Sequence, residues 1–230
     1  MRIWAIGDIH LDHTKEKAMG IFGDHWKDHD EKIYRAWMEK VKEDDLVLIP
    51  GDISWALKWE EAQKDLEFID ELPGKKILSK GNHDYWWSGM KKMESKNWKS
   101  IKFLQNNSFF TEDGIGIFGT RGWIASDTDN FTEQDLKIKK REVLRLGLSF
   151  ESMKEKCKKK IVMIHYPPFQ QDFSGNEFTD MMEREEVDIC IYGHLHGDGH
   201  RYVLEEERKG VNYICVAADY INFSPIRLEV

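Results

Sequence analysis

Seven short apolar runs recur along the chain, and they limit its possible folds more than any other feature. Each run is rich in β-branched residues and is bounded by Gly, Asp, Asn or Pro. Most lack the in-and-out alternation of a sheet that has one face in water. The runs therefore predict strands that are buried on both faces. They are Arg2–Ile6, Leu46–Ile49, Lys76–Leu78, Ile115–Phe118, Ile161–Ile164, Asp188–Tyr192 and Asn212–Val216.

Helical patterns separate these runs. Apolar residues at helical spacing form one stripe at Ile33, Trp37 and Val41 and another at Ala62, Leu66 and Ile69. A longer, polar helix is expected from about Thr132 to Lys156, with the basic run Lys154–Lys160 at its C-terminal end. Strands that alternate with helices predict an α/β fold. The 230 residues contain no internal repeat and no Pro/Ser-rich linker, so we expect a single domain over 1–230.

The charge balance narrows the classes of partner. The chain has 34 Lys+Arg against 42 Asp+Glu, a net charge of −8, which argues against binding to long nucleic acids or anionic membranes. A small phosphate-bearing substrate remains compatible, because a site can create its own local field. No apolar run reaches the roughly 18–20 residues of a membrane span. Asp8 comes too early for a signal peptide, and the three Cys form no CxxC pair, so we expect a cytoplasmic protein.

Polar side chains follow five of the predicted strands at the point where each strand ends. In open α/β sheets, ligands bind at the carboxyl ends of the strands. The sequence therefore predicts a functional site at this edge. The five segments are Gly7-Asp8-Ile9-His10, Pro50-Gly51-Asp52, Gly81-Asn82-His83-Asp84, His165-Tyr166-Pro167-Pro168 and Gly193-His194-Leu195-His196-Gly197.

Seven of these side chains are oxygen or imidazole ligands, a mixture that suits Mn²⁺, Fe²⁺/Fe³⁺ or Zn²⁺. Seven ligands exceed the need of one ion, so the sequence predicts two. Alternate residues of an extended segment point to the same side, and each D-x-H or H-x-H pair is therefore expected to converge. A single His at the end of a strand more often has a structural role. Metal binding is indicated here because seven such side chains occur together. The set is Asp8, His10, Asp52, Asn82, His165, His194 and His196.

The five segments, taken in order, resemble the calcineurin-like metallophosphoesterase superfamily. The pattern is D-x-H, G-D, G-N-H-D, a lone His and G-H-x-H, and it extends from Asp8 to His196. The resemblance implies two mixed β-sheets packed face to face with helices outside, a four-layer α-β-β-α sandwich. It also implies hydrolysis of a phosphomonoester or phosphodiester by in-line attack of a hydroxide that bridges two metal ions. The substrate is expected to be small, with a nucleotide among the candidates.

The resemblance also implies a role for each residue of the pattern. Asp8, His10 and His196 would hold the first ion, Asp52 would bridge, and Asn82, His165 and His194 would hold the second. His83 would contact the phosphate and protonate the leaving oxygen, and Asp84 would fix the tautomer of His83. Asn82 and Arg121 are further candidates for substrate contact; an ordinary salt bridge is the alternative for Arg121.

One departure from the family pattern is visible, since many members carry a second Asp where this chain has Ile53-Ser54-Trp55. Aromatic residues crowd the motif loops, where they either pack beneath the loops or form a wall that stacks a nucleobase. Three other assignments remain as alternatives to a small-molecule phosphoesterase: a non-catalytic scaffold of the same fold, a nuclease, and a metallo-β-lactamase-like hydrolase with an H-x-H-x-D-x-H site. The roles of His13, His25, His29 and His200 are not assigned by the pattern.

Overall fold

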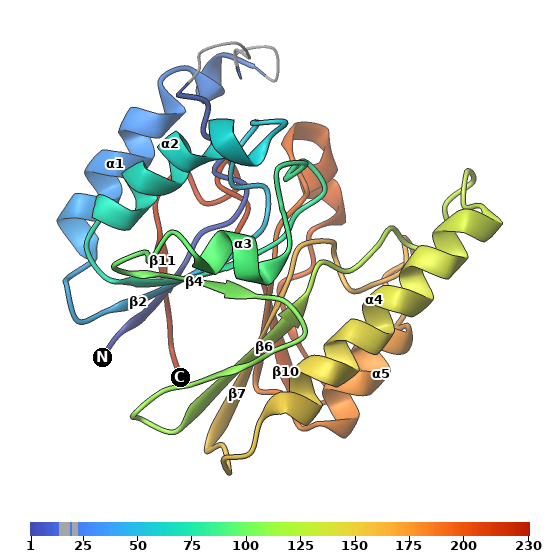
Figure 1. Ribbon diagram of the computed structural model, residues 1–230. Helices are drawn as coiled ribbons and strands as arrows, with labels where there is room; N and C mark the ends of the chain where they lie inside the picture. Colours follow the sequence, from blue (N-terminus) through green and yellow to red (C-terminus); the bar gives the residue numbers. More distant parts are fainter. Residues whose placement is uncertain (14–18, 20–22) are drawn as a thin grey trace.

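Two mixed β-sheets form the centre of the protein (Figure 1). The computed structural model describes residues 1–13, 19 and 23–230. The first sheet has the strand order β11-β1-β2-β3-β4 and the second has the order β5-β6-β7-β8-β10-β9. The strands are β1 Ile3–Ala5, β2 Leu46–Pro50, β3 Lys75–Ser79, β4 Ile101–Leu104, β5 Phe109–Phe110, β6 Ile115–Thr120, β7 Lys159–Ile164, β8 Ile189–Tyr192, β9 Glu207–Arg208, β10 Val211–Cys215 and β11 Ile226–Leu228.

All seven predicted strands are present, and they occupy the interior of the two sheets. Neighbouring interior strands run parallel, whereas β11, β5 and β9 are antiparallel to their partners. The four strands that the sequence did not predict, β4, β5, β9 and β11, form the four sheet edges. Each has two to four residues and contains at least one exposed residue. Such segments lack the continuous apolar run that marks a strand buried on both faces.

The helices are α1 His29–Lys40, α2 Trp59–Glu71, α3 Met90–Glu94, α4 Glu133–Ser152 and α5 Glu177–Arg184. The predicted end of α4 at Lys156 is wrong, because the helix stops at Ser152. The basic run therefore lies outside the helix, although Lys154 Nζ still donates to the last turn at the carbonyl of Glu151 (3.2 Å). No helix in the described part of the chain is both long enough and apolar enough to cross a membrane.

The apolar side chains pack in three layers, which gives the four-layer α-β-β-α sandwich that was predicted. Along β2, Leu46 and Leu48 pack between the sheets, whereas Val47 and Ile49 point the other way. The outer layers bury the first sheet beneath α1 and α2 and the second beneath α4 and α5 (Figure 1).

The two sheets meet where their parallel strands end. Gly7, just beyond β1, pairs with Ala217, just beyond β10. The amide of Gly7 donates to the carbonyl of Val216 (2.7 Å), and the amide of Ala218 donates to the carbonyl of Gly7 (3.0 Å). This seam brings together the loops that follow the strands of both sheets, and the predicted site residues lie on these loops.

Candidate metal centre

The loops after β1 and β2 run side by side and fix each other's backbone. The amide of Asp8 donates to the carbonyl of Gly51, and the amide of His10 donates to the carbonyl of Asp52, both at 3.0 Å. His29, at the start of α1, also contacts the carbonyl of His10 through Nε2 (3.1 Å). The backbone that carries two predicted ligands of the first ion is therefore held from two sides.

Four of the seven predicted ligands have left-handed backbone conformations, with φ of +54° at Asp8, +44° at His10, +51° at Asp52 and +73° at His194. The expectation that the ligand pairs lie on extended segments is therefore wrong. Such conformations cost non-Gly residues about 1–3 kcal/mol each and are concentrated at functional sites. The surrounding hydrogen bonds compensate this cost and set where each ligand points.

Two motif glycines allow the carboxylates to pack directly against the chain. A Cβ atom at Gly81 would lie 2.1 Å from Oδ1 of Asp52, and one at Gly193 would lie 2.1 Å from Oδ2 of Asp8. Neither contact is possible for a real side chain, so both positions require Gly if the carboxylates are to stay in place.

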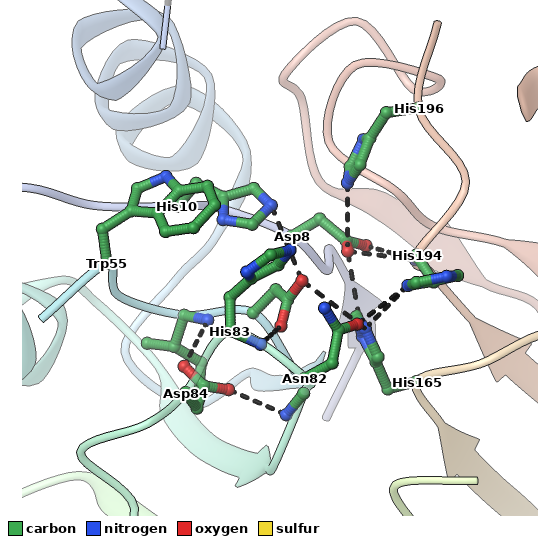
Figure 2. A network of polar contacts seen from close by, with 12 residues as sticks. Asp8, His10, Trp55, Asn82, His83, Asp84, His165, His194 and His196 are labelled. Carbon is green, nitrogen blue, oxygen red and sulfur yellow. Dashed lines mark hydrogen bonds and ion pairs between the residues drawn. The ribbon is translucent and has the colours of Figure 1, made fainter. Parts of the chain in front are cut away.

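The side chains predicted for the first ion lie together (Figure 2). Ligand atoms of Asp8, His10 and His196 are all within 4.8 Å of one another. Nε2 of His196 lies 3.4 Å from Oδ1 of Asp8. This Nε2 is buried and makes no hydrogen bond to the described residues, so it is a polar atom that a metal ion could satisfy.

The side chains predicted for the second ion also converge. Oδ1 of Asn82 lies 2.6 Å from Nε2 of His165 and 2.9 Å from Nδ1 of His194, and the two nitrogens are 3.2 Å apart. Figure 2 shows these three side chains on the flank of the site opposite His10 and Trp55. His165 also belongs to a second metal-compatible group with Asp8 and Asp52.

Asp52 lies between the two groups. Its Oδ2 is 3.7 Å from Nε2 of His10 and 3.5 Å from Nε2 of His165. His10 belongs to the first predicted ligand set and His165 to the second. Its Oδ1 accepts a hydrogen bond from the amide of His83 at 2.8 Å. The carboxylate is thus fixed by the third motif while its second oxygen points at both groups.

The protonation of His165 supports a cation at the second group. Burial lowers the pKa of His165 to about 3, so the ring is neutral and carries one proton. We assign that proton to Nδ1, because Nδ1 lies 3.1 Å from the carbonyl of Pro50, which can only accept. Nε2 then presents a lone pair toward the amide oxygen of Asn82. Burial likewise lowers the pKa of His194 to about 3. Facing lone pairs of this kind fit a metal ion held between them.

The buried carboxylates also favour a bound cation, because their negative charges are not balanced by the neighbouring side chains. Burial, reinforced by the negative charges of Asp8 and Asp84, raises the pKa of Asp52 well above its usual value. Burial also lowers the pKa of His10, so the imidazole resists the positive charge that would balance these acids. A buried cluster with this composition would be stabilised by divalent ions, which supply the charge that the side chains lack.

The structure adds Asp219, a buried residue that the sequence patterns did not single out. Its Oδ1 lies 2.8 Å from Nδ1 of His196, and its Oδ2 accepts from the amide of Gly197 at 3.1 Å. Although burial opposes the charge, the hydrogen bond to Asp219 and the nearby carboxylate of Asp8 raise the pKa of His196 to about 10. Nε2 of His200 and of His25 also face Asp219, at 3.2 and 3.8 Å.

A signal for Asp219 was present in the sequence. The strand predicted at Asn212–Val216 is followed by Ala217-Ala218-Asp219, so a sixth strand of the sheets ends in an acidic residue. The other ligands were predicted because they follow a strand almost directly. Asp219 fits the same pattern if two residues are allowed between the strand and the acidic side chain.

His83 and Asp84 follow β3 at the centre of the site. The ring of His83 has its centroid 5.7 Å from that of His10 and 4.4 Å from that of Trp55. Trp55 stacks on His10 at 4.7 Å, so the departure from the family pattern places an aromatic ring over two site histidines. Asp84 accepts from the amides of Ile53, Ser54 and Gly81 and from the Trp86 indole, at 2.8–3.2 Å.

Two other residues from the sequence analysis have partners away from the ligand groups. Arg121 pairs with the buried Glu142 (3.4 Å) and stacks on Trp123 (4.4 Å). This pairing agrees with the salt-bridge alternative and leaves its contact with substrate a prediction. His13 lies against Asp65 of α2, with 2.6 Å between Nδ1 and Oδ1, and this contact raises the pKa of His13 although burial opposes it.

The family model for calcineurin-like phosphoesterases matches residues 1–198. Among curated proteins, the chain is similar to the Gene 66 protein of Mycobacterium phage L5, with 35% identity over 81 residues, or 35% of this chain. It is also similar to the Gene 66 protein of Mycobacterium phage D29, with 37% identity over 83 residues, or 36% of this chain. These matches span 39% and 40% of the lengths of the two phage proteins.

Among solved structures, the fold is similar to that of TT1561 from Thermus thermophilus. The TM-score is 0.53 and the identity is 13%, with 84% of this chain and 81% of that chain covered. At this identity the comparison supports the fold alone.

Proposed function

Because the chain belongs to the calcineurin-like phosphoesterase family, we propose that it hydrolyses a small phosphoester with the help of two divalent metal ions. The observation that carries the proposal is the position of Asp52. One oxygen of this carboxylate lies within 3.7 Å of an imidazole from each ligand group. A carboxylate in that position can serve both ions, as the proposed chemistry requires.

The two ligand groups would be Asp8, His10 and His196 with Asp52, and Asn82, His165 and His194 with Asp52. Mn²⁺, iron or Zn²⁺ would suit these oxygen and imidazole donors. Ions bound there would polarise the phosphoryl group and supply a nucleophilic hydroxide near neutral pH.

The remaining chemistry falls to the side chains. An alkoxide is a poor leaving group until it is protonated, and His83 is the residue we propose as the proton donor. The backbone amide of His83 donates a hydrogen bond to Asp52, so the proposed proton donor and the proposed bridging carboxylate are held at a fixed distance from each other. Asp84 has four N–H donors on its carboxylate, and we propose that it acts mainly by fixing the loops that carry His83 and Asp52.

The test combines metal content with activity. Purified protein would be loaded with Mn²⁺, analysed for bound metal, and assayed on p-nitrophenyl phosphate and bis-p-nitrophenyl phosphate. We expect turnover of at least one substrate. Asp52→Asn should lose most activity together with bound metal, whereas His83→Ala should lose activity and keep its metal. Asp198→Asn, an exposed acid close to the site, is the matched control.

Two results would contradict the proposal. A folded protein that binds two ions and is inert on a broad phosphoester panel would favour the scaffold alternative. A folded protein that binds no divalent ion would contradict the proposal that metal ions take part in the reaction.

A further inference from the structure

An apolar cavity lies beside the second ligand group. Its volume is about 160 Å³, and His194, a proposed ligand, forms part of its wall. The cavity is smaller than the roughly 300–1,000 Å³ of pockets that enclose a whole drug-sized ligand. It therefore suits one part of a substrate whose phosphate lies at the ligand groups.

Four aromatic side chains from three separate segments contribute to this wall: Trp123, Tyr166, Phe169 and Tyr202. The ring centroids of Tyr166 and His194 are 4.2 Å apart, and those of Trp123 and Tyr166 are 5.5 Å apart. A row of neighbouring rings thus extends from His194, a proposed metal ligand, into the cavity. The apolar area of such rings favours contact with another ring.

Two polar side chains of the wall, those of Gln170 and Thr128, are already hydrogen-bonded within the protein. Gln170 donates from Nε2 to the hydroxyl of Ser126 (2.7 Å) and accepts from the Ser126 amide (3.0 Å). The hydroxyl of Thr128 donates to the carbonyl of Ala125 (3.0 Å). These two side chains are therefore less available to a ligand, which favours recognition by shape and ring contact.

We propose that this cavity binds a planar aromatic ring carried by the alcohol part of the phosphoester, an inference that rests on the proposed function. A nucleobase and a simple aryl group both supply this chemistry. The cavity lies on the side of His194, so a phosphate at the ligand groups and a ring in the cavity would belong to one molecule. The ring would then orient the phosphoester before hydrolysis.

Two variants change the cavity without replacing a proposed ligand or His83. Ala125→Phe would fill it, and Tyr202→Ala would remove an aromatic wall whose side chain is 39% exposed. Tyr34→Ala, which removes a similarly exposed tyrosine from α1, is the matched control. Three substrates are compared: adenosine 5′-monophosphate, phenyl phosphate and glycerol 3-phosphate. The ratio of variant to wild-type kcat/KM is taken for each substrate, so that differences between leaving groups cancel.

Both cavity variants should lower kcat/KM for the two ring-bearing substrates by at least about fivefold, the lower range for loss of a stacking contact. Hydrolysis of glycerol 3-phosphate should be unchanged, as should all three reactions in Tyr34→Ala. If only adenosine 5′-monophosphate is affected, the ring is a nucleobase; if both are affected, any aryl group suffices. An equal loss on all three substrates would overturn the proposal.

Equilibrium binding separates this inference from the proposed function. Adenosine and phenol, which have no phosphate, are titrated separately into metal-free wild-type protein and into Ala125→Phe, and binding is measured by calorimetry. Binding that is lost in Ala125→Phe supports the cavity even if no phosphoester is turned over. If neither adenosine nor phenol binds to the wild-type protein, the ring site is wrong, whatever the protein hydrolyses.

Discussion

The carboxylate of Asp219 holds the imidazole of His196 through a 2.8 Å contact between Oδ1 and Nδ1. This contact fixes the orientation of the ring and directs Nε2 at Oδ1 of Asp8, 3.4 Å away. A carboxylate behind a ligating imidazole fixes its orientation and raises its basicity. Asp219 comes from the second sheet beyond β10, so a residue outside the five motifs orients one of the proposed ligands.

Replacing Asp219 with Asn should therefore weaken the first metal site. Loss of such a partner typically costs about 10- to 100-fold in metal affinity or activity, and we expect a loss in that range. Metal affinity is measured by titration of the metal-free protein with Mn²⁺. Asp198→Asn changes an exposed acid nearby and should leave the affinity unaltered. Equal affinities for Asp219→Asn and wild type would show that His196 needs no such partner.

The two tight glycines lead to a second prediction. Gly193→Ala places a methyl group where Oδ2 of Asp8 now lies, and Gly81→Ala does the same to Asp52. A shift of about 1 Å in a catalytic group can cost on the order of 100-fold in rate, and we expect losses of that size in kcat.

Gly89→Ala is the matched control, since no atom lies within 4 Å of the added methyl group and the residue has a negative φ. It should retain wild-type activity. Circular dichroism of all three variants checks that they fold. Normal kcat in folded Gly193→Ala would mean that the position of Asp8 is not critical.

The interior strands and the residues that follow them are predictable from the sequence for a simple physical reason. The interior strands are buried on both faces, so their residues must be apolar almost without interruption, and polar residues appear abruptly where each strand ends. Asp8 and Asp52 stand out for this reason. The edge strands β5 and β9 have only two residues each and are partly exposed, so no such contrast marks them.

Other features depend on contacts between distant parts of the chain. Asp84 is next to His83 in sequence, which favoured a role behind its imidazole. The donors that surround Asp84 come partly from Ile53 and Ser54, about thirty positions earlier. Only the fold brings that loop to the carboxylate, and the same is true of Asp219 and His196.

Asp84 provides the third prediction. In Asp84→Asn, one carboxylate oxygen becomes an NH₂ group that faces N–H donors, so at least one buried backbone amide loses its acceptor. We expect a loss of about 1–3 kcal/mol in the free energy of unfolding, measured with urea. Activity should fall as well, because the loops that carry His83 and Asp52 are loosened. Unchanged stability with strongly reduced activity would instead favour a direct role of Asp84 on His83.

The last prediction concerns the pH dependence of stability at Asp45, far from the site. This buried carboxylate accepts from Arg2 (Nη2, 2.6 Å), from Trp4 (Nε1, 3.1 Å) and from the amide of Lys42 (3.0 Å). Although burial disfavours its charge, these hydrogen bonds lower the pKa of Asp45 from 3.8 to about 2. The folded state therefore prefers the ionised form more than the unfolded state does.

The direction of the pH effect follows from that difference. The stabilisation is complete above the unfolded pKa near 4 and is lost as the pH falls toward 2, because the folded protein must then take up the proton. Asp45→Asn should cost about 1–2 kcal/mol at pH 7, a modest value since Arg2 is partly exposed. Urea unfolding of both proteins from pH 7 to pH 3 should show the gap shrinking below about pH 4. Asp44→Asn, an exposed neighbour, is the control, and a gap that stays constant down to pH 3 would contradict the role of the ionised carboxylate.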